Sequence, residues 1–431
     1  MTNGLPFPVL AYRAGLTLLE PAAAGLLAWR RRRGLEEQAR LPERRGYPGR
    51  DRPTGSLVWM HGASVGETLS LVPLVERLTQ RGFLVLVTSG TRTSAALMTR
   101  RLPPGAIHQF IPLDVPRYMR RFLDHWRPDL ALLAESEIWP NTVIELEARQ
   151  VPLILVNGRM SERSFRRWRR WPAAIGALLQ RFSLCLAQSA ADAERFASLG
   201  APRVAVTGNL KFDAAPPPAD HHAVAQLSGL LAGRPVWLAA STHPGEEEAV
   251  AAAHEALLDR FPHLLTILVP RHPDRGADIA DLVRSAGLNT GLRSQGDRPD
   301  RTVQVYVADT VGETGLFYRI APVVFVGGSL VPHGGQNPIE PAKLGAAILH
   351  GSHVHNFADA YALLDRTGGA TTLPDAAALA PAVHDLLANP ARARAMTRAA
   401  REAVAGAAGA VERTLQMIEP YLVPVRTEVR R

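Results

Sequence analysis

The sequence of 431 residues contains one cysteine, Cys185, within the apolar run LCLAQS. A single thiol cannot form a disulfide within the chain, so we expect the protein to reside in a reducing compartment. The apolar neighbours of Cys185 predict a buried position on a strand. A nucleophilic role is the weaker alternative.

Lysine is nearly absent. Only Lys211, in GNLKFD, and Lys343, in EPAKLG, stand among 49 basic residues. A compositional preference for arginine explains most of this scarcity. Where such a chain keeps a lysine, the position can require a compact ammonium group that arginine does not offer. We therefore regard both segments as candidates for function.

Several ligand-binding motifs are missing from the chain. D-x-D, which commonly holds a divalent cation on a nucleoside diphosphate, does not occur, and neither does the phosphate loop G-x-x-x-x-G-K-[ST]. No zinc-finger or ribonucleoprotein motif is found. His350, His353 and His355 lie close together, but no cysteine is near them to complete a zinc site. The sequence thus predicts no metal ion, no cofactor and no nucleic-acid partner.

Charge is unevenly distributed along the chain. Residues 1–213 hold 30 basic and 18 acidic residues, whereas residues 214–431 hold 19 and 22. A basic first half favours an acidic partner: an anionic lipid, a phosphorylated substrate or nucleic acid.

An arginine–aromatic block, RSFRRWRRW, lies in this basic half at residues 163–171. On one helix Phe165, Trp168 and Trp171 would share a stripe with arginines beside it. Such a block suits an anionic membrane surface or lipid phosphates. We therefore predict that Arg163, Arg166 and Trp168 belong to an acceptor-binding or membrane-facing surface.

The N-terminal segment 5–29 is apolar and long enough to enter or span a bilayer, although Arg13 and Glu20 interrupt it and Pro21 bends it. Four arginines follow at 30–33, which places the rest of the chain on the cytoplasmic side. A cleaved signal peptide fits poorly, because the charges follow the apolar run. We predict that residues 1–33 form a membrane anchor or an interfacial helix. The alternative is a soluble helix that covers the first domain.

From residue 56 on, short apolar runs alternate with helical patterns, which predicts doubly wound α/β domains with parallel sheets. The predicted strands lie at 56–60, 83–89, 106–112, 130–136, 152–158, 184–189 and 203–209, and then at 235–241, 264–270, 303–309, 322–328 and 346–352. A proline-rich linker at 214–222 separates domains at 34–213 and 223–405. A last helix, within 406–431, is expected to pack back on the first domain.

Loops that follow parallel strands are the most informative, because ligands bind at the carboxyl ends of such strands. In GGSLVPHGGQNPIEPAKLG, Asn337 is a predicted N-cap, with Pro338 in the first turn and Glu340 three residues after the cap. Gly334 and Gly335 leave the backbone open, and a helix N-terminus favours a phosphate. The stretch predicts a nucleotide site with Glu340 on ribose hydroxyls. A capping box without a ligand is the alternative.

The first domain presents carboxylates in its loops. Glu67 is the last residue of HGASVGE, which contains two glycines. These glycines either form a phosphate-binding loop or leave room for a substrate beside Glu67. In LALLAESEIWPN, Glu135 and Glu137 follow an apolar run and point to the same side of an extended chain. They are placed to hold a sugar or to tune each other's proton affinity. One of them capping the next helix is the alternative.

Taken together, these motifs resemble those of the Kdo transferases, which attach 3-deoxy-D-manno-octulosonic acid (Kdo) to the lipid A precursor of Gram-negative bacteria. HGASVGE, TSGTRTSA, PLDVP, ESEIWPN, VNGRMSERSF, GNLKFD, VPRHPDR, DTVGE and GGSLVPHGGQNPIEPA occur in the expected order over residues 5–425. The resemblance implies a GT-B fold, in which two Rossmann-like domains face a cleft. It also implies CMP-Kdo as donor, a tetraacyl-disaccharide 4'-phosphate (lipid IVA) as acceptor, and the cytoplasmic face of the inner membrane.

The resemblance also implies roles for individual residues. Glu67 is similar to the family's general base, and Glu137 and Lys211 to its transition-state stabilising positions. The implied CMP site comprises Pro270, Arg271, Val311, Gly312, Glu313, Asn337, Pro338, Ile339 and Glu340. The implied reaction is a metal-independent, inverting transfer, and a donor with one phosphate agrees with the missing D-x-D. A helix N-terminus lowers the basicity of a carboxylate, so Glu67 needs desolvation to act as a base.

Two alternatives predict other functions. One is another GT-B enzyme, a transferase or an epimerase, that uses a UDP-sugar. The other is a non-catalytic lipid binder at the membrane surface, built from the basic half of the chain.

Overall fold

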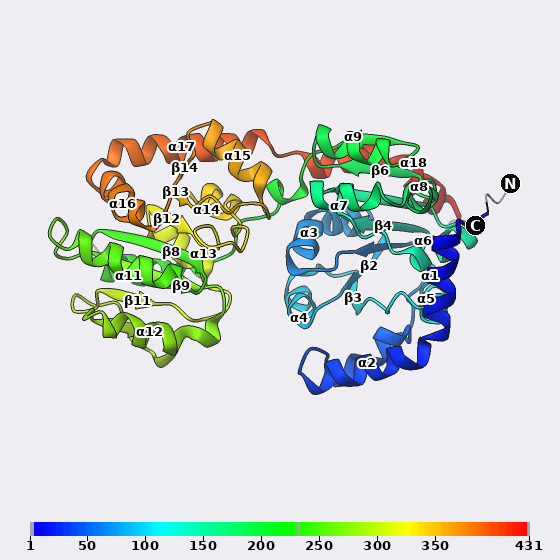
Figure 1. Cartoon of the computed structure of the whole chain (residues 1–431), viewed down its shortest axis with the longest axis horizontal. Coiled ribbons are helices and arrows are strands. Elements are labelled where there is room, and N and C mark those ends of the chain that lie inside the picture. The colour runs from blue at the N-terminus through cyan, green and yellow to red at the C-terminus, as the bar shows by residue number, and fades with distance from the viewer. Residues whose placement is uncertain (1–3, 232, 429–431) are drawn as a thin grey trace. The chain divides into compact units, whose positions relative to one another are not determined.

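The computed structural model describes residues 4–231 and 233–428. They form two compact units: unit 1 comprises the residues up to 214 together with those from 407 on, and unit 2 comprises residues 215–406. Each unit contains a seven-stranded sheet with helices packed against it (Figure 1). The prediction of two doubly wound α/β domains is confirmed.

In unit 1 the strand order is β3-β2-β1-β4-β5-β6-β7, and all pairs are parallel. The strands are β1 Leu57–His61, β2 Leu84–Ser89, β3 Ala106–Phe110, β4 Leu130–Ala134, β5 Leu153–Gly158, β6 Leu184–Ala187 and β7 Val204–Val206. Each of them overlaps a predicted strand. The helices are α1 Phe7–Leu18, α2 Glu20–Arg32, α3 Val65–Gln80, α4 Arg92–Arg101, α5 Pro116–Trp126, α6 Pro140–Ala148, α7 Glu162–Trp168, α8 Pro172–Leu179, α9 Ala190–Ser198 and α18 Ala410–Glu428, with 3-10 helices η1 Gln38–Arg45 and η2 Leu210–Phe212.

In unit 2 the order is β10-β11-β9-β8-β12-β13-β14, again with parallel pairs. The strands are β8 Val236–Thr242, β9 Leu265–Pro270, β10 Thr290–Leu292, β11 Val305–Val307, β12 Val323–Val326, β13 Ala347–His350 and β14 Ala370–Thr372. Five match predicted strands, whereas β10 and β14 were missed. The helices are α10 His221–Leu230, α11 Glu246–Leu257, α12 Gly276–Ser285, α13 Thr314–Ile320, α14 Ile339–Leu344, α15 Ala358–Arg366, α16 Leu379–Ala388 and α17 Pro390–Gly406, with 3-10 helices η3 Pro273–Arg275, η4 Arg293–Gln295 and η5 Ala376–Ala378.

Each sheet has one point at which the direction of winding reverses. In unit 1 the chain leaves β1 toward β2 and β3, then returns to place β4 on the other side of β1. In unit 2 the same reversal separates β8 from β12. Ligands of doubly wound sheets bind outside the carboxyl ends of the strands at such a switch point. The loops that follow β1, β4, β8 and β12 are therefore the first places to look for function.

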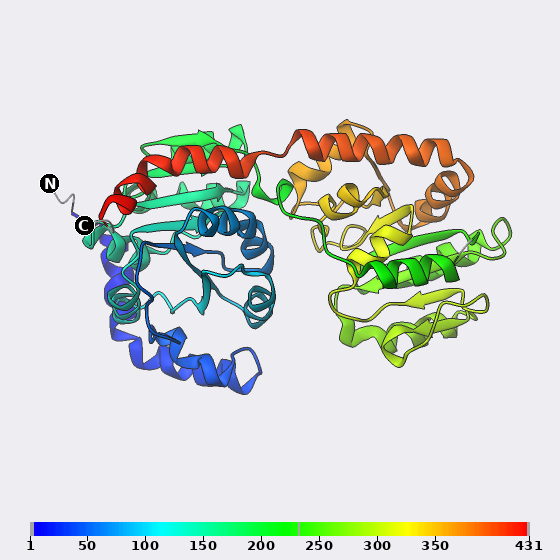
Figure 2. The same cartoon turned by 180° about the vertical axis from the view of Figure 1, so that it is seen from behind.

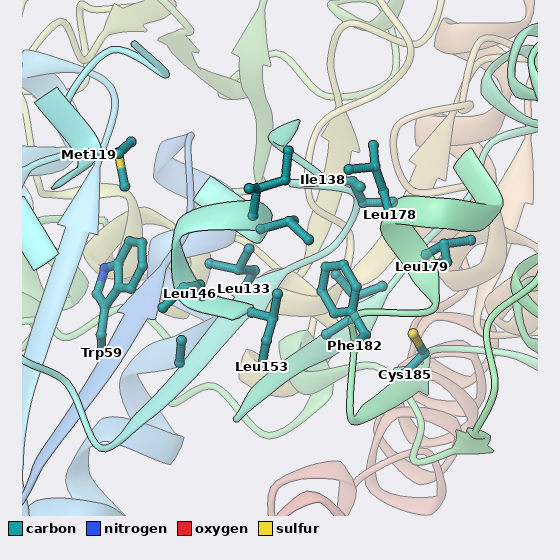
Figure 3. Packing of buried hydrophobic residues seen from close by; sticks show 14 of the residues in the cluster. Trp59, Met119, Leu133, Ile138, Leu146, Leu153, Leu178, Leu179, Phe182 and Cys185 are labelled. Carbon is teal, nitrogen blue, oxygen red and sulfur yellow. The ribbon is translucent and has the colours of Figure 1, made fainter. Parts of the chain in front are cut away.

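Both faces of the unit 1 sheet are covered, which explains its almost continuously apolar strands. One face packs around Trp59, Leu133 and Leu153 against α5, α6 and α8 (Figure 3). Cys185 is fully buried in this cluster on β6, and burial raises the pKa of its thiol to about 12. The prediction of a buried strand cysteine is confirmed.

The other face packs against α3 and the C-terminal helix α18, whose Leu415, Ile418 and Leu422 are buried there (Figure 2). The start of α18 is tied to the end of η2, because the carboxylate of Asp213 accepts hydrogen bonds from the backbone N–H groups of Gly409 and Val411. The C-terminal helix thus packs on unit 1.

The N-terminal segment is two helices, α1 and α2, which separate at Leu19 just before Pro21. Val9 is buried in the unit 1 core, and Arg13 forms an ion pair with Glu145 of α6. Tyr12 donates a hydrogen bond to Asp114 over 3.1 Å. Of the helices within residues 4–231 and 233–428, none combines the length and the apolar character needed to cross a bilayer.

One local prediction was wrong. The arginine–aromatic block does not form a single helix, because α7 ends at Trp168 and α8 begins at Pro172. Proline disfavours helical geometry in the residue before it, and Trp171 has φ −129° and ψ 55°. Phe165 and Trp168 pack against the unit 1 core. Trp171 remains 55% exposed and does not continue their stripe.

Candidate active site

The loop after β1 forms the start of α3 and fixes Glu67. Ser64 is the N-cap: its hydroxyl accepts a hydrogen bond from the N–H of Glu67 and donates one, over 2.7 Å, to Oε1 of the same residue. The N–H of Ala63 donates to Oε2 of Glu67 over 2.8 Å. Gly62 faces the first turn of α3, since a Cβ there would lie 3.1 Å from Cβ of Glu67, whereas Gly66 faces open space.

Burial raises the pKa of Glu67 above its ordinary value of 4.5, although the hydrogen bond from Ser64 opposes this. The negative charges of Glu135 and Glu137 raise the pKa further, and the backbone N–H of Ala63 lowers it. Desolvation and the neighbouring carboxylates therefore outweigh the hydrogen bonds from Ser64 and Ala63. Glu67 is a stronger base than a carboxylate in water.

The two glutamates after β4 do not lie on one side of an extended chain, so that expectation was wrong. The strand ends at Ala134, and Glu135 adopts a left-handed conformation with φ 52°. Glu135 accepts a hydrogen bond from Nζ of Lys211 over 2.8 Å. Glu137 takes different partners, His61 and the indole N–H of Trp139.

His61, the last residue of β1, is a member of the site that the sequence analysis missed. It is 2% exposed, and its Nε2 lies 3.5 Å from Oε2 of Glu137. Its Nδ1 lies 3.1 Å from the main-chain oxygen of Thr88 on β2. Burial by itself would raise the pKa of Glu137, but His61 and Trp139 hold it below its ordinary value. A polar residue ending an apolar strand at the switch point was the available signal.

Two asparagines place Lys211 on η2. Asn209 caps this turn by accepting the N–H of Lys211, and Asn157 accepts the N–H of Leu210. Asn157 itself has φ 53° and is the next-to-last residue of β5. Unit 1 thus brings together Glu67, Glu137 and Lys211, which the sequence had placed far apart in three motifs.

In unit 2 the glycine-rich loop after β12 is held by a buried carboxylate, Glu246 of α11. Its two oxygens accept hydrogen bonds from the N–H groups of Gly328, Ser329, Leu330 and His243, over 2.7–3.0 Å. These amides are therefore committed to Glu246. Glu246 was not predicted as a functional residue, because it lies within an ordinary acidic helix start, GEEE.

The expectation that Gly334 and Gly335 leave backbone open for a ligand was also wrong. Both residues are buried and have positive φ. A Cβ at Gly334 would lie 2.6 Å from side-chain atoms of His355 and Asn356, and one at Gly335 would lie 3.1 Å from the main-chain oxygen of His353. These glycines give space to the protein's own loop 353–356.

The helix after this loop, α14, begins at Ile339, two residues after Asn337. Pro338 occupies the N-cap position. Asn337 nevertheless performs the capping: its Oδ1 accepts the N–H of Ile339, and its Nδ2 donates to Glu340 over 3.1 Å. The predicted cap chemistry is present with a helix boundary shifted by one residue.

The remaining predicted donor residues lie at the end of β9 and in the loops after β9 and β11. Pro270 ends β9, and the side chain of Arg271 is exposed. Val311 is 80% exposed beside Gly312, which has φ 89°. The carboxylate of Glu313, in contrast, is held by Arg293 and Thr310, so it braces this loop.

Arg163 and Arg166 lie on α7, where they line an open depression of about 790 Å³ together with Arg167 and Arg170. Arg166 is partly neutralised by Glu162 at 2.8 Å. Trp168 is only partly exposed because it packs on the core. Within the described part of the chain, no three His, Cys, Asp or Glu residues are placed to hold a metal ion. His350 is instead bonded to Asp365 and to the backbone of Gly351.

Two doubly wound units, each with polar loops at its switch point, define the GT-B fold. A glycosyltransferase structure from Rickettsia africae shows the same fold, with a TM-score of 0.59 at 12% identity, covering 86% of this chain and 99% of that chain. A UDP-N-acetylglucosamine 2-epimerase structure from Neisseria meningitidis, at 13% identity, has a TM-score of 0.53 and covers 85% of this chain and 100% of that chain.

Sequence comparison identifies the family. A family model described as 3-deoxy-D-manno-octulosonic-acid transferase (kdotransferase) matches residues 39–214. The chain is 38% identical over 413 residues to the 3-deoxy-D-manno-octulosonic acid transferase of Bordetella pertussis, covering 92% of this chain and 96% of the relative. It is 35% identical over 404 residues to a probable mitochondrial enzyme of that name from Arabidopsis thaliana, covering 91% and 90%. The chain belongs to the Kdo transferase family and is a glycosyltransferase.

Proposed function

We propose that this enzyme transfers Kdo from CMP-Kdo to a hydroxyl group of an acylated glucosamine disaccharide phosphate, the tetraacyl-disaccharide 4'-phosphate precursor of lipid A. Membership of the Kdo transferase family supports the transferred sugar. The observation that carries the chemistry is a carboxylate of raised pKa, Glu67, beside the Lys211–Glu135 ion pair at the switch point of unit 1.

In this proposal Glu67 is the general base. It removes the proton of the acceptor hydroxyl while the oxygen attacks the anomeric carbon of Kdo, and the bond to the CMP phosphate breaks. A well-placed base contributes roughly 10²–10⁴-fold in rate. The raised pKa brings Glu67 closer to neutral pH, which increases its driving force for proton transfer while it stays ionised.

Lys211 and Glu137 have the role of stabilising charge in the transition state. Lys211 presents an ammonium group that Glu135 holds at 2.8 Å. Glu137 is kept ionised by His61 and Trp139, so it is available to a developing positive charge on the sugar ring. Preorganised charges of this kind cost no reorganisation during the reaction.

The nucleotide of the donor is assigned to the carboxyl ends of the unit 2 strands. Arg271 has an exposed guanidinium suited to the phosphate. The exposed segment Val311–Gly312, braced by Glu313, offers an apolar edge and open backbone to the cytosine ring. Asn337 to Glu340 present the ribose contact, with the carboxylate of Glu340 oriented by Asn337.

We also propose that α1 and α2 attach the enzyme to the cytoplasmic side of the inner membrane. Phe7, Leu18, Leu19 and Trp29 are 81%, 80%, 57% and 47% exposed. Four arginines at 30–33 follow, which suits an interfacial helix pair on anionic lipid. The arginines of α7 add a second basic surface for the acceptor phosphate or for lipid.

Donor discrimination tests the proposed function. The purified chain is incubated with detergent-dispersed lipid A precursor and either freshly made CMP-Kdo or UDP-sugars, with and without a chelator, and the lipid products are analysed by mass spectrometry. We expect Kdo adducts from CMP-Kdo in both conditions. Turnover of UDP-sugars without turnover of CMP-Kdo would show that the donor assignment is wrong.

A further inference from the structure

Three imidazoles meet at the switch point of unit 2, in residues that the donor site described above does not include. His243 follows β8, His272 follows β9, and His333 lies in the loop after β12. The rings of His243 and His333 are stacked, with centroids 4.0 Å apart and an interplanar angle of 19°. His272 meets His243 edge to face at 6.0 Å. The stack thus bridges the two strands between which the winding of the sheet reverses.

The cluster is electropositive. Burial, together with the positive charges of His333, His272, Arg271 and Arg275, lowers the pKa of His243 to about 4. Glu246 is enclosed by four amides, and Glu247 and Arg275 pair with each other at 2.8 Å, so the exposed Arg271 is the cation that we assign to a ligand. The positive charges that contribute to this shift in the pKa of His243 also attract an anion.

The orientation of His243 is fixed by Gln336. The side-chain amide of Gln336 lies 3.0 Å from Nε2 of His243. An amide nitrogen is a donor only, so Nε2 accepts and the proton of the neutral ring sits on Nδ1. His243 therefore keeps one N–H donor for a ligand at neutral pH.

These contacts favour an oxyanion over a metal ion. Two rings stacked face to face direct their nitrogens along parallel planes, so the lone pairs do not converge on one ion, and no three-residue metal group is found in the described chain. Backbone amides of the neighbouring loop are committed to Glu246. An anion here must be bound by side chains.

We propose that Arg271, His272 and the His243–His333 stack form an oxyanion site that binds one of the two anionic groups of the donor, its phosphate or its sugar carboxylate. This inference rests on the proposed function for the identity of the donor. It adds three histidines to the donor site. The site then supplies a guanidinium group and imidazole N–H donors where a diphosphate enzyme would rely on a metal ion.

Binding measurements with the full chain test the site. Calorimetry gives the affinities of 5'-CMP and of cytidine for the wild type, His333→Ala and His272→Ala, two exposed positions. The matched control is His353→Ala, an exposed histidine of unit 2 outside the cluster. Thermal unfolding checks that each variant folds.

If the site binds the phosphate, the preference for CMP over cytidine falls roughly tenfold in His333→Ala and His272→Ala, the effect of losing one hydrogen bond to a charged group. If it binds the carboxylate, CMP affinity is unchanged and the KM for CMP-Kdo rises by a similar factor. The proposal is overturned if both the preference for CMP over cytidine and the KM for CMP-Kdo in these variants equal those of His353→Ala.

A separate measurement distinguishes failure of the donor assignment from failure of the site. The imidazole resonances of His243 and His333 are followed by NMR while inorganic phosphate is added. If the wild type binds no CMP, the donor assignment is wrong. Even then, saturable shifts of the imidazole resonances on adding phosphate, if they vanish in His272→Ala, support an oxyanion site. Absence of any shift with phosphate and of any CMP binding would contradict both.

Discussion

The ammonium group of Lys211 lies 2.8 Å from Oε1 of Glu135, and each of these side chains is only 14% exposed. The pair connects η2 to the end of β4, and Glu135 also raises the pKa of Glu67. One carboxylate therefore holds the cation of the site in place and increases the basicity of its proposed base.

A double-mutant cycle tests this pair. Lys211→Met removes the ammonium partner of a mostly buried carboxylate, which we expect to lower the free energy of unfolding by about 1–3 kcal/mol. Glu135→Gln alone strands the ammonium in the same way. The double variant should lose less than the sum, because no unpaired charge is left. Urea unfolding measures all four proteins, and additive losses would contradict the pairing.

The pH dependence of transfer should follow Glu67. A base acts when deprotonated, so the rate rises with pH through its pKa, which lies above 4.5. Glu135→Gln removes a negative charge that raises this pKa, so the acidic limb of the profile moves to lower pH. Ser64→Ala removes a hydrogen bond that lowers it, so the limb moves to higher pH.

The matched control for this profile is Glu76→Gln, an exposed position on the same helix, which should leave the limb in place. Ser64→Ala also removes the N-cap of α3 and should cost about 1 kcal/mol of stability. If both site variants move the limb in the same direction, a residue other than Glu67 sets it.

The stability of unit 2 should depend strongly on Glu246. In Glu246→Gln the side-chain amide turns an N–H₂ group toward backbone N–H donors, which leaves at least two of the four amides unsatisfied in the core. We expect a loss of about 2 kcal/mol or more, measured by calorimetry. The control Glu255→Gln, exposed on the same helix, should unfold like the wild type.

Membrane attachment should depend on the exposed apolar residues of α1. Phe7→Ser with Leu18→Ser removes two side chains that are each about four-fifths exposed. We expect at least a roughly tenfold weaker affinity for anionic vesicles, because each apolar group inserted into lipid contributes about 1 kcal/mol or more. Co-sedimentation measures this. Val206→Ser, at a half-exposed valine of β7, is the control, and equal loss there would argue against the proposed surface.

Much of the fold could be predicted from the sequence because parallel strands buried on both faces are continuous apolar runs. Twelve such runs were recognised, including LALLA of β4 and VVFV of β12. The two missed strands, β10 and β14, are three residues each, TGL and ATT, and carry little apolar signal. Their position is set by pairing with β11 and β13, which a local pattern does not reveal.

The site was less predictable, because its partners come together through tertiary structure. Glu67, Glu137 and Lys211 were identified through family motifs, but the pairing of Lys211 with Glu135 depends on the φ of 52° that ends β4. His61 was overlooked because histidine at a strand end is usually structural. The glycines at 334 and 335 were misjudged because sequence does not show that a loop of the same chain fills the space beside them.

The most direct test of the account is single-turnover transfer by Glu67→Gln, a variant of nearly the same shape that cannot accept the proton. With lipid A precursor and CMP-Kdo, and with product mass as the readout, we predict that Kdo transfer falls at least about a hundredfold. Affinity for CMP, a property assigned to unit 2, should stay within about twofold of wild type. Transfer at a rate close to that of the wild type would contradict the role of Glu67 as the base and, with it, the proposed mechanism.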